Sequence, residues 1–272
     1  MPATPAAIAP FSPPRRAVLA TTFIAALALM PLLAPQAAQA SPLEGSGTPV
    51  TETRTVAAFD GIALSGSLDL VVRQGAQQSV QVQADDNLLP LLETVVEPAR
   101  NGGSTLKVRW KREGGWGGSW NSGWNRVQPR TKVLVTVVVP TLTSVAVAGS
   151  GDVRVETLNT PSFQLSLSGS GDARLQGLNT EDLSVRVSGS GDVAGQGSAT
   201  RLKISIAGSG DVRLAEMRSD EVSVSIAGSG DAAVNAQKAL SVSIAGSGDV
   251  SYTGEPQVKS SVAGSGSVRR KP

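Results

Sequence analysis

The sequence contains no cysteine and no histidine. Without cysteine there are no disulfides, no thiolate chemistry and no lipid-modified N-terminal cysteine. Without histidine the chain lacks the commonest general base and the commonest metal ligand. Aromatic residues make up only 3% of the chain, which is rich in glycine, serine and valine. Such a composition also occurs in disordered chains, but the apolar positions here recur with a strict period, and disorder does not produce that.

The chain carries almost no net charge. The formal charge of +2 comes from Arg15 and Arg16, and the remaining chain holds equal numbers of basic and acidic residues. Nucleic-acid-binding proteins present clustered positive charge, so this balance argues against nucleic acid as a partner. The basic ending "RRKP" is local and is interpreted as a solvated end.

Residues 1–40 have the pattern of a secretory signal peptide. Arg15 and Arg16 precede an apolar run over 17–33, and small residues then lead to a predicted cleavage site after Ala40. The paired arginines leave both the general secretory route and twin-arginine export open. The alternative is an uncleaved anchor, but the run is short for a bilayer and contains a proline. We predict an exported protein with no stable membrane span after signal removal.

A Gly-Ser-Gly-Asp motif recurs every 18 to 20 residues in the second half of the chain. The last copy ends in serine instead of aspartate. A fixed period of this length predicts a repeat architecture with one supersecondary unit per repeat. The first glycines of the copies are Gly149, Gly169, Gly189, Gly208, Gly228, Gly246 and Gly264.

Apolar and polar residues alternate on both sides of each motif. Val185 and Val187 precede one copy and Val193 follows it, and the equivalent positions of the other copies are also apolar. A period of two predicts strands with one buried face. Strands that return to the same column every turn predict an all-β fold, a parallel β-helix (β-solenoid) rising about 4.8 Å per turn. The alternative β-sandwich needs hairpin signals and no such columns.

The motif itself is interpreted as a corner between two strands. Glycine adopts positive φ without steric cost, and aspartate accepts hydrogen bonds from turn N–H groups. The alternative is a calcium site, since stacked carboxylates repel one another; calcium, however, requires six to eight oxygen ligands. Arg154, Arg174 and Arg213 lie two residues after an aspartate and are expected to relieve this repulsion. The predicted structural ladder is Asp152, Asp172, Asp192, Asp211, Asp231 and Asp249.

The first half of the chain is a looser version of the repeat. Gly66 begins a related "GSLD" copy, and the 83 residues from there to Gly149 predict about four turns with an insertion. The stretch "ADDNLL" predicts a short helical turn capped by Asp85 or Asp86. We predict a flexible linker over 41–53 before the domain begins.

Three tryptophans stand four residues apart in the insertion 111–126, among glycines, serines and asparagines. This pattern fits neither a core strand nor a stable helix. One interpretation is a flexible loop that packs its rings on the solenoid. The other is an exposed aromatic platform for sugars, proteins or lipid headgroups, because tryptophan offers a large contact area with a polar handle. The candidate ligand-binding residues are Trp116, Trp120 and Trp124.

Several stretches together resemble the head GIN domain family of secreted bacterial proteins labelled auto-transporter adhesins. They are "RTVAAFDGIALSGSLDLVVRQG", "ADDNLLPLLETVV", "VVVPTLTSVAVAGSGDV" and "YTGEPQVKSSVAGSGSVRR", and the resemblance covers residues 54–270 as a single domain. It implies a right-handed β-helix-like fold in the bacterial cell envelope, periplasmic or at the surface. The family has no assigned catalytic residue, so the resemblance implies none here, and it says nothing of the tryptophan-rich insertion.

The leading hypothesis is a non-catalytic binding protein, adhesin-like, with envelope polysaccharide or a surface protein as its partner. We expect no cofactor, no metal and no catalytic residue. One alternative is a polysaccharide lyase or glycosidase, which needs convergent carboxylates, or an arginine base with a cation, at one place in a groove. A uniform ladder without a break does not fit that chemistry. The other alternative is a structural protein stacking end to end, against which the basic C-terminus and the missing last aspartate argue.

Overall fold

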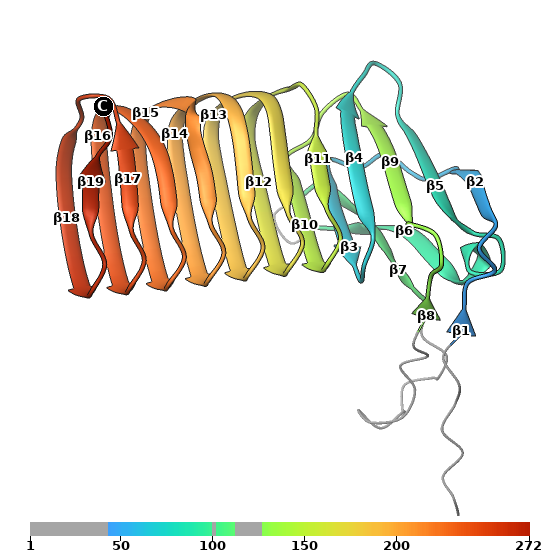
Figure 1. The fold of residues 1–272 in the computed structure, drawn as a ribbon. Coiled ribbons are helices and arrows are strands. Elements are labelled where there is room, and N and C mark those ends of the chain that lie inside the picture. The colour runs from blue at the N-terminus through green and yellow to red at the C-terminus, as the bar shows by residue number, and fades with distance from the viewer. Residues whose placement is uncertain (1–42, 100–101, 112–126) are drawn as a thin grey trace, which may run out of the picture. The chain divides into compact units, whose positions relative to one another are not determined.

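The computed structural model describes residues 43–99, 102–111 and 127–272 (Figure 1). The predicted signal peptide, 1–40, lies outside the described residues, as does most of the insertion. Seventeen strands form one continuous hydrogen-bonded sheet, and most neighbours run parallel. The described residues contain one short 3-10 helix, η1 (Leu89–Leu91), and no α-helix. The predicted all-β solenoid is therefore confirmed.

The regular part of the solenoid begins at residue 144. From residue 158 to residue 246 each turn is one long strand that ends at a corner, and each strand pairs in parallel with the equivalent strand of the next turn, so that Leu183 lies beside Leu202. The strands are β10 (Ser144–Gly149), β11 (Val153–Val155), β12 (Leu158–Gly169), β13 (Ala173–Gly189), β14 (Val193–Gly208), β15 (Val212–Gly228), β16 (Ala232–Gly246), β17 (Val250–Thr253), β18 (Gln257–Gly264) and β19 (Val268–Arg270).

The core is a set of aliphatic columns that run through the stacked turns. Val185, Ile204 and Val224 form one such column, and each side chain is almost completely buried. Burying a side chain of this size stabilises the fold by about 1.5–3 kcal/mol. Because each turn covers the apolar side chains of its neighbours, the buried residues form a single cluster from Phe59 to Val250.

The first half of the chain is wound in a different order from that predicted. β3 (Gly61–Ser65) and β4 (Asp69–Gln74) pair directly with β10 and β11. The corners at Gly66 and Gly149 are thus immediate neighbours, and the prediction of about four turns between them is wrong. The chain between these corners builds a turn from β7 (Ser104–Trp110) and β9 (Leu134–Val139), which pair with β3 and β4 on the side away from β10 and β11. The chain then crosses to the opposite side of β3 and β4 and continues as β10.

Antiparallel strands close the solenoid at this end. β5 (Ser79–Asp85) runs antiparallel to β9, β2 (Pro49–Arg54) to β5, and β6 (Leu92–Pro98) to β7. A separate two-residue parallel pair joins β1 (Leu43–Glu44) to β8 (Val127–Gln128), which directly follows the insertion in the sequence (Figure 1). The flexible linker predicted over 41–53 is wrong for its described part, because these residues form β1 and most of β2. We call β1, β2, β5, β6, β8 and η1 the N-terminal cap.

Candidate functional site

The corners require glycine because neighbouring turns approach one another closely there. Gly189 has a φ of 127°, which side-chain-bearing residues rarely adopt. A Cβ atom at this position would lie 2.3 Å from the carbonyl oxygen of Gly169 in the preceding turn. The same relation repeats from corner to corner along the stack. The close approach of the backbones and the positive φ therefore explain why the motif contains glycine.

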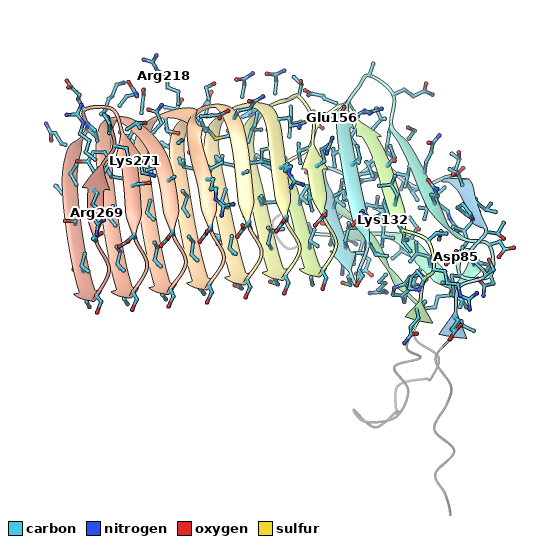
Figure 2. All side chains as sticks on the ribbon, viewed as in Figure 1. Asp85, Lys132, Glu156, Arg218, Arg269 and Lys271 are labelled. Atoms are coloured by element: carbon cyan, nitrogen blue, oxygen red, sulfur yellow. The ribbon has the colours of Figure 1, made fainter. Side chains whose placement is uncertain are left out.

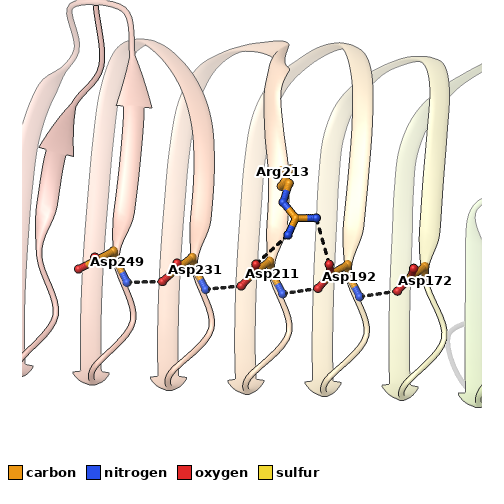
Figure 3. A network of polar contacts seen from close by, with 6 residues as sticks. All are labelled: Asp172, Asp192, Asp211, Arg213, Asp231 and Asp249. Carbon is orange, nitrogen blue, oxygen red and sulfur yellow. Dashed lines mark hydrogen bonds and ion pairs between the residues drawn. The ribbon is translucent and has the colours of Figure 1, made fainter.

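The aspartates of the motif form a hydrogen-bonded ladder between turns (Figure 3). The carboxylate Oδ1 of each one accepts a bond from the backbone N–H of the aspartate in the next turn. For example, the Asp192 N–H donates to Asp172 at 3.0 Å, and the Asp211 N–H donates to Asp192 at 2.9 Å. Because the acceptor is charged, such bonds are stronger than those between neutral groups. The side chain here replaces a backbone carbonyl at the corner.

The ladder is longer at both ends than the six predicted residues. Asp69, in the "GSLD" copy, accepts the N–H of Asp152 at 3.0 Å, and its second oxygen lies 3.7 Å from the Lys132 ammonium. At the other end, both the N–H and the hydroxyl of Ser267 donate to Asp249 at 2.8 Å. The serine that replaces the last aspartate therefore ends the ladder with a donor. These bonds hold the pKa of Asp249 below its usual value.

One arginine neutralises part of the ladder. Arg213 donates to Asp192 at 3.0 Å and to Asp211 at 2.9 Å, bridging two turns (Figure 3). The sequence predicts the same role for Arg154 and Arg174, but among the described residues neither of them forms an ion pair with a ladder aspartate. Each carboxylate instead accepts a hydrogen bond from an N–H group, and this bond reduces the repulsion between neighbouring carboxylates. In the described part of the chain, no group of three or more carboxylates converges as a metal site would require.

A groove of about 480 Å³ lies where the ladder meets the basic C-terminal residues. Its walls include Asp231 and Asp249 from the ladder and Arg269 and Lys271 from the end of the chain. The lining mixes valine and alanine residues with side chains of both charges, whereas sites for small molecules are lined mostly by apolar groups. The groove lies at the last turn, where Ser267 takes the place of the motif aspartate.

The predicted ligand-binding residues, Trp116, Trp120 and Trp124, lie outside the described residues. The structure does describe where their segment begins and ends. Residues 111–133 connect β7 to β9, as Gly66 to Leu68 connect β3 to β4 in the next turn. The insertion thus takes the place of one corner, at the end of the corner column. There the ring of Trp110, at the end of β7, lies over Gly66, and its atoms would be 3.3 Å from a Cβ atom added to that glycine.

Asp85 holds the chain in place just after the insertion. Its carboxylate is fully buried and accepts bonds from the Thr131 hydroxyl at 2.8 Å and from the N–H groups of Arg130 at 2.8 Å and Gly47 at 3.1 Å. Burial alone would raise its pKa, but these bonds outweigh that effect and the pKa is lowered. The prediction that Asp85 or Asp86 caps a helical turn is wrong, because η1 begins without a side-chain cap. Asp85, labelled in Figure 2, instead joins β5 to the segment between β1 and β2 and to the segment between β8 and β9.

Residues 58–256 match the protein family described as "Putative auto-transporter adhesin, head GIN domain". The chain belongs to the head GIN domain family. The matched region includes every ladder aspartate, the insertion and all the corners except the last one at Gly264, and it confirms the family resemblance of the sequence. A search of the curated proteins gives no match.

Solved structures share the head GIN fold. A "putative adhesin" from Bacteroides fragilis has a TM-score of 0.72 at 24% identity, covering 84% of this chain and 100% of that one. A "putative lipid binding protein" from Parabacteroides distasonis has a TM-score of 0.68 at 25% identity, covering 85% and 100%. A "putative adhesin" from Parabacteroides merdae has a TM-score of 0.62 at 22% identity, covering 86% and 100%. The family and these structures carry names of adhesins or binding proteins, not of enzymes. Within the described residues, no helix has the length and hydropathy to cross a membrane.

Proposed function

We propose that the exported chain is a non-catalytic binding protein of the bacterial cell envelope, and that the tryptophan-rich insertion carries its binding site. The observation that supports this is the place where the repeat is interrupted. The first glycine of every corner from Gly149 to Gly264 has a positive φ, whereas the turn of β7 and β9 carries the insertion instead of a corner. A binding site built on a regular scaffold is expected where the regularity ends.

The base of the insertion supports this assignment because hydrogen bonds hold the chain on both sides of it. Asp85 binds the backbone at Arg130 on one side, and the N–H of Lys111 donates to the Leu91 carbonyl at 2.8 Å on the other. Arg130 also forms an ion pair with Glu44 at 2.7 Å. A loop whose two ends are held in place loses less conformational entropy when its side chains bind a ligand.

The ligand class that fits best is an envelope polysaccharide, with a surface protein as the other partner. Tryptophan rings present a flat apolar face and one N–H donor, which suits a surface with both apolar and polar parts. The adhesin names of the family and of the similar solved structure support a binding role. The structure named as a lipid-binding protein makes lipid vesicles a necessary comparison in the experiment.

Intrinsic tryptophan fluorescence of a chain starting at residue 41 tests the proposal. The titrants are envelope polysaccharides, vesicles and calcium. We expect a blue shift on adding one polysaccharide, and its loss when Trp116, Trp120 and Trp124 are replaced by alanine. Trp110 remains in both proteins as an internal reference. Blue emission from the start that no titrant changes would mean that the rings are packed on the solenoid, and would overturn the proposed binding site.

The enzyme alternative is tested with the same polysaccharides. A lyase or glycosidase would generate new reducing ends, and a lyase also new double bonds, during incubation with the protein. We expect neither product. The proposed location, in the periplasm or at the cell surface, is tested by cell fractionation and by the sensitivity of intact cells to added protease. Recovery of the mature chain in the cytoplasm would contradict export.

A further inference from the structure

The C-terminal end of the solenoid exposes the edge of its last turn. β18 pairs with β16 and β19 pairs with β17, and in the described residues no strand lies on the outer side of either. Val258 and Val262 occupy the columns of Leu240 and Ile244, yet they are 40% and 41% exposed. This end therefore combines unpaired backbone groups with uncovered apolar side chains, and such an edge tends to pair with another strand.

The two ends of the solenoid differ in this respect. The antiparallel strands of the N-terminal cap cover the first turn, whereas the last turn is covered by nothing in the described residues. β18 pairs with β16 without a register shift and contains no proline, so two common protections of an edge strand are absent. Lys259 is the single charged residue of this strand. A contact between the C-terminal ends of two copies is thus favoured over a contact between the C-terminal end of one copy and the N-terminal cap of another.

We propose that two copies of the chain join at these ends, with β18 of each running antiparallel to the other about a two-fold axis at Ser260. In this register Val258 lies opposite Val262 of the second copy, and Ser260 lies opposite itself. Inward-facing side chains then meet inward-facing ones, so the exposed valines cover one another on the core face. A shift by one residue would place the core face of one strand against the outer face of the other.

The charges at this end are compatible with that register. Lys259 lies opposite the neutral Ser261 of the second copy. Arg270 is already neutralised within its own chain by Glu255 at 3.0 Å. Arg269 and Lys271, seen at the C-terminal end in Figure 2, remain and repel their copies in the dimer. Because salt screens such repulsion, added salt is expected to strengthen the dimer.

The dimer goes beyond the proposed function and does not depend on it. A two-fold contact is closed, so it gives a pair and not a filament. It places the two N-terminal caps at opposite ends of a continuous stack. If the cap ends bind, the pair is bivalent, and a surface that repeats its ligand would be bound more tightly by the pair than by one copy.

Sedimentation and light scattering of the chain from residue 41 measure the contact. We expect twice the monomer mass, with dissociation on dilution and a lower dissociation constant at higher salt. Ser260→Lys places two charges at the axis and is expected to give monomers with an unchanged circular dichroism spectrum. Ser243→Lys, on the exposed outer face of β16, is the matched control and is expected to stay dimeric. A monomer at every soluble concentration, or a polymer, would overturn the proposal.

The register is tested by a disulfide, because the chain has no cysteine of its own. Directly opposed residues of antiparallel strands have Cα atoms about 4.5–5.5 Å apart, within the range that a disulfide bridges. Ser260→Cys is expected to form a covalent dimer on mild oxidation, and Ser243→Cys is not. A dimer that Ser260→Lys leaves intact and Ser260→Cys does not cross-link would contradict this register.

Discussion

The backbone N–H of Asp172 donates to the carboxylate of Asp152, twenty residues earlier, at 3.1 Å. A side chain here supplies the acceptor for one corner N–H group, beside backbone bonds between the same turns such as that from the Ser170 N–H to the Gly149 carbonyl. The same bond follows at each later aspartate of the ladder. The repeat of aspartate thus has a structural cause, and no bound ion is needed to account for it.

Replacing Asp172 with alanine is expected to lower the free energy of unfolding by about 1–2 kcal/mol, because the N–H of Asp192 loses its acceptor. Asp172→Asn keeps an acceptor oxygen without the charge and is expected to cost less. Urea denaturation followed by circular dichroism measures both values. Ser188→Ala, an exposed side chain in the same turn, is the control. Equal stability of Asp172→Ala and the wild-type protein would contradict the ladder.

Replacing Arg213 with alanine is expected to cost less than the loss of a ladder aspartate. Its side chain is 58% exposed, and exposed ion pairs contribute about 0–1 kcal/mol. The effect should shrink further at high salt, because salt screens exposed charges. Denaturation at low and high salt measures it. A loss larger than that of Asp172→Ala would mean that the arginine, and not the N–H groups, holds the carboxylates together.

Gly189→Ala and Gly177→Ala separate steric contact from backbone strain. Both glycines have a positive φ. At Gly189 the new Cβ would lie 2.3 Å from a backbone oxygen, whereas at Gly177 the nearest atom, the Thr157 hydroxyl oxygen, is 3.4 Å away. We expect about 1 kcal/mol of destabilisation at Gly177 and more than about 3 kcal/mol at Gly189, as for other close backbone contacts. Thermal and urea unfolding provide the comparison, and similar losses at both positions would contradict it.

Asp85 makes the N-terminal cap sensitive to acid. Its pKa is lower in the folded protein than in the unfolded chain. It therefore stabilises the fold above the unfolded pKa of about 3.9, and this contribution is lost as the pH falls through the folded pKa. Asp85→Asn should destabilise the protein at pH 7, and the difference from wild type should shrink toward pH 2. Asp86→Asn, at its exposed neighbour, is the control. A difference that does not change with pH would contradict this role.

The repeating half of the fold could be predicted from the sequence because every turn repeats the same local pattern. Val185, Ile204 and Val224 stand at the same distance before their corners, and this alone places them in one column. The aspartate ladder follows from the same alignment. Its first member, Asp69, has the same spacing from its glycine as the later ones, so the same signal identifies it.

The first half could not be predicted in this way because its contacts join segments far apart in the chain. The corners at Gly66 and Gly149 are neighbours in space, and no local pattern reveals that the turn between them is built on the other side. The partners of Asp85 lie 38 and 46 residues away, at Gly47 and Thr131. A short polar run such as "ADDNLL" fits a capped turn equally well, and only the tertiary structure decides.

The central claim is that the Gly-Ser-Gly-Asp repeat builds a scaffold and that binding takes place at the tryptophan-rich insertion. The most direct test compares binding isotherms on immobilised envelope polysaccharide for the wild-type chain, Asp172→Ala, and the alanine variant of Trp116, Trp120 and Trp124. We predict that the folded Asp172→Ala protein binds like wild type and that the tryptophan variant loses binding. Loss of binding by Asp172→Ala, with the tryptophan variant unaffected, would place the binding surface on the ladder and contradict the account.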